Sequence, residues 1–329
     1  MPEAAPIEEV LEPDLPICDP HHHLWDYPTS RYLLPELLAD VESGHKVEST
    51  VFVECGAFYG PEGASGLGFV GETEFVNGVA AMAANGRDGP VKACEAIVGR
   101  VDLAVGASVE AVLERHMRAG NGRFRGIRHV GAWDASPDIR PSHTHPPEGL
   151  YGSAAFREGF SRLSRLGLSF EAWQYHTQIG DVIGLARAFP ETLIVLDHVG
   201  GPLGIGPYAG RRDEVFAVWR EGVRELALCP NVWVKLGGLG MAICGFEHHK
   251  RDVLPGSAEL AEAWRPYIET CIEAFGPARA MFESNFPVDK VSCSYANLWN
   301  AFKRIAAGAS ADEKALLFRD TARKFYRMD

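Results

Sequence analysis

The feature that most constrains the fold of this chain is a repeated alternation of short β-rich runs with longer helical patterns. The runs are almost continuously apolar, as expected for strands of a parallel sheet that is covered by helices. Each run is followed by a connection long enough to include a helix, which parallel strands require. The eight runs are Ile17–Asp19, Ser49–Glu54, Val91–Val98, Phe124–His129, Leu168–Trp173, Thr192–His198, Asn231–Leu236 and Ala280–Asn285.

The helical patterns complete the repeat. They cover Glu72–Ala84, Val109–Ala119, Phe156–Leu166, Ile179–Phe189, Glu214–Ala227, Ala258–Phe275, Asn297–Ala307 and Ala311–Tyr326. Eight strand–helix units in 329 residues predict an α/β protein folded as a single (β/α)8 TIM barrel. A doubly wound open sheet is the alternative, but it usually has fewer strands, and no GxGxxG turn follows the first run.

The domain organisation follows from the same pattern. Residues 1–15 are predicted to be an N-terminal arm, and residues 16–329 to be the barrel domain. The long connections follow the carboxyl ends of strands, which is the face where barrel enzymes place their active sites. These connections are Gly56–Gly71, Gly131–Tyr151 and Gly237–Pro255.

The amino-acid composition excludes several classes of binding partner. A formal charge of −12 argues against nucleic acid or an anionic membrane as the main partner, and no stretch approaches the roughly 20 apolar residues of a membrane span. Seven scattered cysteines without a CxxC pair are typical of reduced thiols, so we expect a cytoplasmic protein. The partner we expect is a small-molecule substrate, and a homo-oligomer stays possible.

Three consecutive histidines follow the first run. Because side chains alternate along a strand, His21 and His23 are expected on one face together with Asp19. Two imidazoles at this spacing can bind one metal ion, since neutral histidine is a common metal ligand. A solvated turn or a chance polar cluster is the alternative.

Polar residues also stand at the ends of later runs. In a parallel barrel the carboxyl ends of all strands meet at one rim, so scattered ionisable residues would form one site. The residues concerned are Glu54, Arg128, His129, Gln174, Tyr175, His176, Asp197, His198, Lys235, Glu283, Asn285 and Asp289.

Several of these stretches together resemble a known family. The segment Asp19–Asp26 resembles the opening of the amidohydrolase superfamily, in its amidohydrolase 2 branch, which includes lactonases. Four more stretches support the resemblance: Arg123–His129, Asp197–Pro202, Phe282–Val288 and Asp320–Tyr326. The resemblance implies a (β/α)8 barrel that hydrolyses a small cyclic ester (a lactone) or a related carboxylated substrate.

The resemblance also implies a metal site. His21 and His23 match the ligand pair of the first strand, while His176 and His198 fall near the histidines of strands five and six. Glu54 lies among apolar residues, where a carboxylate is costly to bury unless it is paired or binds a cation. We therefore expect a divalent metal, zinc or alternatively manganese, on His21, His23, Glu54 and one further histidine. An ion pair between Glu54 and Arg128 is the competing interpretation.

The chain departs from the family at the eighth run. Members usually carry an aspartate before the Phe-Pro or Trp-Pro pair, where it activates water, and this chain has Asn285. A carboxamide can orient water but cannot accept its proton at neutral pH. Candidates for the base are Asp289, Glu283 and Glu54.

Substrate contacts are expected at the same rim. Arg128 and Lys235 are predicted to hold a carboxylate or a developing oxyanion, with structural ion pairs as the alternative. His129, Trp173 and Tyr175 are predicted to line the substrate pocket, although aromatic side chains at strand ends are equally often core residues.

The expected activity is thus metal-dependent hydrolysis, with Asn285, Asp289, Arg128 and Lys235 as catalytic residues. A metal-dependent decarboxylase or C–C lyase is the enzymatic alternative, because it needs no hydrolytic water. A non-catalytic small-molecule binding barrel is the alternative from another class.

Overall fold

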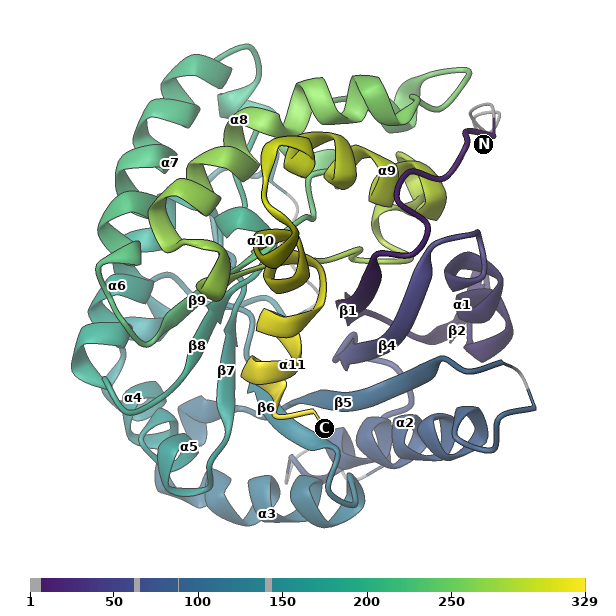
Figure 1. Cartoon of the computed structure of the whole chain (residues 1–329). Coiled ribbons are helices and arrows are strands. Elements are labelled where there is room, and N and C mark those ends of the chain that lie inside the picture. Colours follow the sequence, from purple (N-terminus) through teal and green to yellow (C-terminus); the bar gives the residue numbers. More distant parts are fainter. Residues whose placement is uncertain (1–6, 62–65, 88, 140–143, 329) are drawn as a thin grey trace.

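The computed structural model describes residues 7–61, 66–87, 89–139 and 144–328. Eight parallel strands form one sheet in which each strand pairs with the next, with helices around it (Figure 1). This confirms the predicted (β/α)8 barrel. The strands are β1 (Pro16–His22), β4 (Lys46–Val53), β5 (Lys92–Arg100), β6 (Phe124–Arg128), β7 (Ser169–Ala172), β8 (Ile194–Leu196), β9 (Val232–Leu236) and β10 (Ala280–Phe282).

The ring closes between its first strand and the segment after its last. The amide of Asn285 donates to the carbonyl of His21 (2.9 Å), and the amide of His23 donates to the carbonyl of Phe286 (2.8 Å). The closure therefore lies at the carboxyl ends of the strands, and it places the Asn285 segment directly beside the histidines.

The helices match the predicted patterns closely, with two differences. The pattern at 156–166 is divided between two helices, and a π-helical segment, Leu316–Asp320, interrupts the last pattern. The helices are α2 (Val70–Ala83), α3 (Val109–Ala119), α4 (Ala154–Phe160), α5 (Arg162–Arg165), α6 (Ile179–Ala188), α7 (Arg212–Ala227), α8 (Ser257–Phe275), α9 (Tyr295–Ile305), α10 (Ala311–Ala315) and α11 (Thr321–Tyr326).

Three elements before β4 were not predicted. A hairpin of β2 (Trp25–Tyr27) and β3 (Ser30–Tyr32) follows the histidines, and the helix α1 (Leu34–Val41) comes next. The two strands are only three residues long, and α1 is eight residues long with a proline in its first turn, so each gives a weak periodic signal.

The interior of the ring has an apolar layer at one end. Inward-facing side chains from β1, β4, β5, β8 and β10 pack with residues of α11, which lies across the ring in Figure 1. The cluster comprises Cys18, Val51, Val53, Ala96, Val98, Val195, Met281, Ala322, Phe325, Tyr326 and Met328. The C-terminal helix α11 thus closes one end of the barrel, beneath the polar residues at the carboxyl ends of the strands.

A β-bulge in β1 corrects one prediction. Asp19 pairs with Thr50 and His22 pairs with Phe52, so three steps along β1 match two steps along β4. The extra residue reverses the alternation, and Asp19 points away from His21 and His23. Its carboxylate instead accepts hydrogen bonds from the Tyr295 hydroxyl (3.0 Å) and the Ser284 amide (3.0 Å) on the outside of the strands.

Residues 7–15, the described part of the predicted N-terminal arm, contact the outside of the barrel. Lys303 on α9 donates to the carbonyls of Leu11 (2.7 Å) and Glu12 (2.9 Å), and Glu8 accepts a hydrogen bond from the Ser257 amide of α8. None of the helices in the described ranges combines the length and apolar character needed to cross a membrane. Parts of the loops 56–71 and 131–151 lie outside the described residues.

We expect Thr50→Val to destabilise the fold. The Thr50 hydroxyl accepts a hydrogen bond from the Cys94 amide (2.9 Å) and lies 2.8 Å from His22 Nε2. All three residues are buried beside the β-bulge of β1. The isosteric valine removes the Thr50 contact of the Cys94 amide and leaves His22 Nε2 with the Cys94 thiol (3.8 Å), which should lower the free energy of unfolding by about 1–3 kcal/mol in urea titrations. Thr29→Val, at an exposed turn, is the control. Equal stability of the two variants would contradict this role.

Candidate active site

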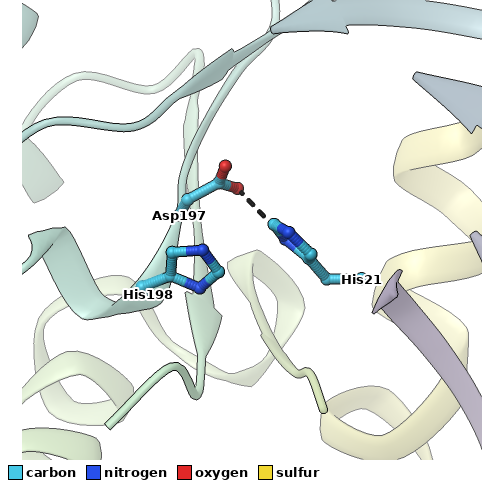
Figure 2. Close-up of side chains that lie close together, drawn as sticks. All are labelled: His21, Asp197 and His198. Atoms are coloured by element: carbon cyan, nitrogen blue, oxygen red, sulfur yellow. Dashed lines mark ion pairs between the residues drawn. The ribbon is translucent and has the colours of Figure 1, made fainter. Parts of the chain in front are cut away.

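Histidines and acids from strands far apart in sequence meet at the carboxyl ends of the barrel. Among the described residues, a single group of metal-ligating side chains has its ligand atoms all within 4.8 Å of one another, and it consists of His21, Asp197 and His198. Figure 2 shows the two imidazoles and the carboxylate facing a common space, with His21 Nδ1 3.7 Å from Asp197 Oδ1. All three side chains are buried.

His23 adds a fourth group, because its Nε2 lies 3.3 Å from Nε2 of His21. His23 Nδ1 lies 2.8 Å from the carbonyl oxygen of Val53. Since a carbonyl can only accept, the ring proton of His23 belongs on Nδ1, and its Nε2 presents a lone pair to His21.

Glu283, just beyond β10, contacts two of the histidines. Its Oε2 lies 2.8 Å from Nδ1 of His21, and its Oε1 lies 2.7 Å from Nδ1 of His198 while also accepting that residue's amide (3.0 Å). The hydrogen bond to Oε1 holds the ring proton of His198 on Nδ1, so Nε2 of His198 is available as a ligand. Oε2 lies close to His21 Nδ1 but makes no hydrogen bond among the described residues. The Nε2 atoms of His21 and His23 face each other, and His21 Nε2 also lies 3.4 Å from Arg128 Nη1.

This arrangement fits a divalent metal. Two nitrogens bound at about 2.0–2.1 Å in tetrahedral geometry are about 3.3 Å apart, which is the spacing of the two Nε2 atoms. Burial, reinforced by the charges of Lys235 and Arg128, lowers the pKa of His21 well below its usual value, and burial does the same for His23. Both rings are therefore neutral, which is the form that binds metals.

Glu54 does not join this group. Its Oε1 accepts a hydrogen bond from Arg128 Nε (2.8 Å), and its backbone carbonyl accepts another from Arg128 Nη2. The other end of the guanidinium lies 3.4 Å from Asp197 Oδ2 and 3.4 Å from His21 Nε2. The structure therefore has the Glu54–Arg128 ion pair that was the competing interpretation, and it commits Arg128 to two buried carboxylates instead of leaving it as a clamp for an anionic substrate.

Lys235 is also placed differently from its predicted role. It points from β9 into the ring, is fully buried, and forms an ion pair with Glu171 of β7. Its Nζ lies 3.3 Å from Asp197 Oδ1 and 3.1 Å from His21 Nδ1. The ammonium is thus beneath the histidines, where alternation along β9 directs it, and not at the rim.

His176 and His129 lie away from the His21 group. The His176 ring packs edge-on against Tyr208, and its Nδ1 accepts the amide of Leu203 (3.3 Å). The His129 ring packs against Phe156, and its Nδ1 accepts the amide of Leu103 (3.2 Å). Each extends past its strand end toward a neighbouring loop, a direction that strand periodicity does not specify.

The two predicted aromatic residues differ in exposure. Trp173 is half-buried, and its ring packs edge-on against His198 with 4.7 Å between centroids. Tyr175 is almost completely buried in a small apolar cluster beside Trp173. Of these two residues, Trp173 is therefore the one whose side chain is partly exposed and could contact a substrate.

Asn285 and Asp289 form a pair next to the histidines. The Asn285 amide nitrogen donates to Asp289 Oδ1 (2.8 Å), and the Gly240 amide donates to Asp289 Oδ2 (2.9 Å). Burial raises the pKa of Asp289 to about 7, against the opposing influences of His198 and these hydrogen bonds. A carboxyl group with such a pKa can exchange a proton near neutrality.

Asp197, Glu283 and Glu171 have larger roles in the structure than we expected from the sequence. Asp197 and Glu283 directly follow β8 and β10, and Glu171 lies within β7. All three contact the cations or histidines of the site. Burial tends to raise the pKa of Asp197, but the neighbouring positive charges, Lys235 foremost, lower it. The sequence signal that could have indicated these roles is a carboxylate within an otherwise apolar run, because a buried carboxylate requires a partner.

Comparisons with known proteins agree on one family. A family model described as "Amidohydrolase" matches residues 18–328. The uncharacterized protein y4mH of Sinorhizobium fredii is 34% identical over 96% of this chain and 99% of its own length. An L-fucono-1,5-lactonase of Burkholderia multivorans is 29% identical over 71% of each chain.

A solved structure extends the likeness to three dimensions. A zinc-bound amidohydrolase from Burkholderia multivorans superposes with a TM-score of 0.73 and 25% identity. The alignment covers 95% of this chain and 99% of that one.

The pKa of Asp289 predicts how stability depends on pH. An unfolded aspartate ionises near pH 4, whereas the folded carboxyl stays protonated to about pH 7. The folded state therefore holds an extra proton between these values, so this group's contribution to stability falls as pH rises.

Asp289→Asn removes that contribution. In chelator-treated protein, the stability of wild type relative to Asp289→Asn should fall by up to about 1.4 kcal/mol per pH unit between pH 5 and 6.5. Urea titrations at several pH values measure it. A difference that stays constant with pH would show that Asp289 ionises normally.

Proposed function

We propose that this chain, which belongs to the amidohydrolase family, hydrolyses a lactone with the help of one divalent metal ion, for which zinc is the first candidate. The observation that carries the proposal is the 3.3 Å approach of the Nε2 atoms of two buried histidines, both of which are neutral because burial lowers the pKa of each ring. The L-fucono-1,5-lactonase relative supports the reaction, and the zinc-bound amidohydrolase supports the metal.

His21 and His23 would hold the ion through Nε2, with His198 or Asp197 from the opposite side of the same space. The ion would supply Lewis-acid polarisation of the lactone carbonyl. Glu283 keeps the ring of His198 in the required orientation and tautomer, and its second oxygen lies 2.8 Å from His21 Nδ1. The ion pairs of Arg128 and Lys235 fix the carboxylate of Asp197 beside them.

Asn285 and Asp289 are the groups that we assign to the water. Two hydrogen bonds fix Asn285: its backbone amide donates to the carbonyl of His21, and its side-chain nitrogen donates to Asp289. Its carboxamide can orient a water molecule by hydrogen bonding, and Asp289 can take up the proton that the water loses on attack. Asp289 suits this role because, unlike Glu54, it is hydrogen-bonded to neutral donors and forms no ion pair among the residues that the structure describes.

The ion pairs of Arg128 and Lys235 also limit the charge of the substrate that the site can bind. Arg128 and Lys235 are both engaged by buried carboxylates, so neither is placed to bind a substrate carboxylate. A lactone without a carboxylate, held against the exposed part of the Trp173 ring beside His198, suits the site better than an anionic one. Sugar lactones such as the relative's are therefore the compounds to test first.

Asn285 gives specific support to a second candidate, a metal-dependent decarboxylase. A decarboxylase needs no activated water, so it would tolerate a carboxamide where hydrolytic members carry a carboxylate. The two activities differ in their products, because lactone opening releases a proton and an acid while decarboxylation releases carbon dioxide.

Metal analysis and product analysis of three proteins test the proposal. Wild type incubated with zinc should bind about one ion per chain and open sugar lactones, measured by proton release. His21→Ala/His23→Ala should lose both properties, because it removes the two facing Nε2 atoms. His248→Ala/His249→Ala, in the loop after β9, is the matched control and should bind zinc normally.

Two results would overturn parts of this account. Absence of zinc and manganese binding in wild type would rule out the metal site. Carbon dioxide release from aromatic acids, without proton release from any lactone, would replace hydrolysis by the second candidate.

A further inference from the structure

A cavity lies at the carboxyl ends of β6 and β7, on the same face of the barrel as the histidines. Its volume is about 350 Å³, and its wall combines aromatic and aliphatic surface with a carboxylate. This volume suits a small molecule, since ligand pockets usually measure about 300–1,000 Å³. Its lining includes Ala132, Trp133, Asp134, Ser136, Ile139 and Tyr175.

Two strand extensions place this cavity above the candidate active site. Beyond β6, Ala132 follows Arg128 at an even interval, so the alternation of side chains directs both toward the barrel axis. Beyond β7, Tyr175 follows Trp173 in the same way. The two extensions still pair with each other, because the Gly131 amide donates to the Trp173 carbonyl (2.9 Å).

Trp173 connects the cavity to the histidines. Its ring contacts His198, with 4.7 Å between the ring centroids, and it contacts Tyr175 of the cavity wall, with 6.0 Å between the centroids. Trp173 also packs against the apolar cluster that contains Ala132, Ile139 and Tyr175. A molecule held against Trp173 beside His198 would therefore have this cavity as its neighbouring space.

Asp134 is fixed in the cavity wall and retains capacity for further hydrogen bonds. Its Oδ1 accepts the amide of Ser136 (2.8 Å), and its Oδ2 accepts the hydroxyl of Tyr208 (2.8 Å). A carboxylate can accept about four hydrogen bonds, so each oxygen can accept one more. Within the part of the chain that the structure describes, no cation forms an ion pair with Asp134.

Tyr208 holds this carboxylate from the loop that follows β8. Burial and the hydrogen bond to Asp134 raise the pKa of Tyr208 to about 12, so its hydroxyl keeps its proton and donates. The ring of His176 packs edge-on against the Tyr208 ring, with 5.2 Å between the centroids. His176, which lies away from the candidate metal ligands, thus supports the wall of the cavity.

The polar groups of the wall favour hydroxyl groups as their partners. The Ser136 oxygen accepts the amide of Asp138 (3.3 Å), and the Ser136 hydroxyl donates to none of the described residues. A ligand hydroxyl can donate to Asp134 and accept from Ser136, whereas an ammonium group can only donate. The apolar surface of Trp133 and Ile139 suits the C–H groups of the carbon skeleton that bears such hydroxyls.

We propose that this cavity is a subsite for the hydroxylated carbons of a sugar lactone, and that Asp134 selects such substrates by accepting hydrogen bonds from their hydroxyl groups. The inference names the substrate class of the proposed function and rests on it for catalysis. Binding of a hydroxylated ring in the cavity does not depend on hydrolysis.

The kinetic test compares Asp134→Asn with Asp138→Asn, an exposed aspartate of the same loop that does not line the cavity. The zinc-incubated enzymes are assayed on L-fucono-1,5-lactone and on δ-valerolactone, which carries no hydroxyl groups. Asp134→Asn should raise KM for the sugar lactone about 10-fold or more at little cost in kcat, because it removes a charged acceptor. Its KM for δ-valerolactone, and both KM values of Asp138→Asn, should stay at the wild-type level.

The binding test uses metal-free protein and 1,5-anhydro-L-fucitol, which has the hydroxylated ring but no ester. Calorimetry should show binding to wild type and Asp138→Asn, and about 10-fold weaker binding to Asp134→Asn. Tyr208→Phe, which removes the hydroxyl that fixes Asp134, should also weaken binding and serves if Asp134→Asn does not fold.

Equal affinity of wild type, Asp134→Asn and Tyr208→Phe for 1,5-anhydro-L-fucitol would overturn the proposal. Wild type that binds 1,4-diaminobutane in preference to the hydroxylated ring would overturn it as well. Wild type that binds 1,5-anhydro-L-fucitol through Asp134 but opens no lactone would support the subsite and contradict the proposed function.

Discussion

The site depends on one carboxylate, that of Glu283, which lies between two imidazoles. Each of its oxygens engages the Nδ1 of a different histidine, and one also accepts the His198 amide. Its hydrogen bond fixes the tautomer of His198, and its two contacts bring the strand that opens the barrel to the loop that follows β8.

The remaining charges are arranged around this carboxylate in a way that explains their burial. Arg128 bridges Glu54 and Asp197, and Lys235 bridges Glu171 and Asp197, so each cation is matched by two acids. Removing one partner of such a buried pair leaves an uncompensated charge, which is strongly destabilising. The ion pairs therefore position Asp197 and also withhold both cations from the substrate.

Much of the fold was predictable because strand and helix periodicities are local properties. The eight apolar runs matched the eight barrel strands, and convergence of their ends brought His21, His23, Asp197 and His198 together. The predicted direction of a side chain was wrong where one inserted residue reverses the alternation along a strand. The bulge in β1 turned Asp19 outward, and nothing in the periodicity of the first run reveals an extra residue there.

Partner choice was the other property that sequence did not determine. From the sequence we preferred Glu54 as a metal ligand over an ion pair with Arg128, and the 2.8 Å approach of Arg128 Nε to Glu54 Oε1 shows the ion pair instead. Likewise, His176 stands at the expected strand end, but its side chain turns toward Tyr208. The direction of a side chain beyond its strand depends on loop geometry, for which local sequence carries little signal.

A crystal structure of the zinc-loaded protein, with zinc located by its anomalous scattering, tests the central claim most directly. The account predicts zinc about 2.0–2.1 Å from Nε2 of both His21 and His23, with Glu54 still paired to Arg128 and Glu283 still on the two Nδ1 atoms. Zinc bound to Glu54, or bound with Nε2 of His21 turned away from it, would contradict the account.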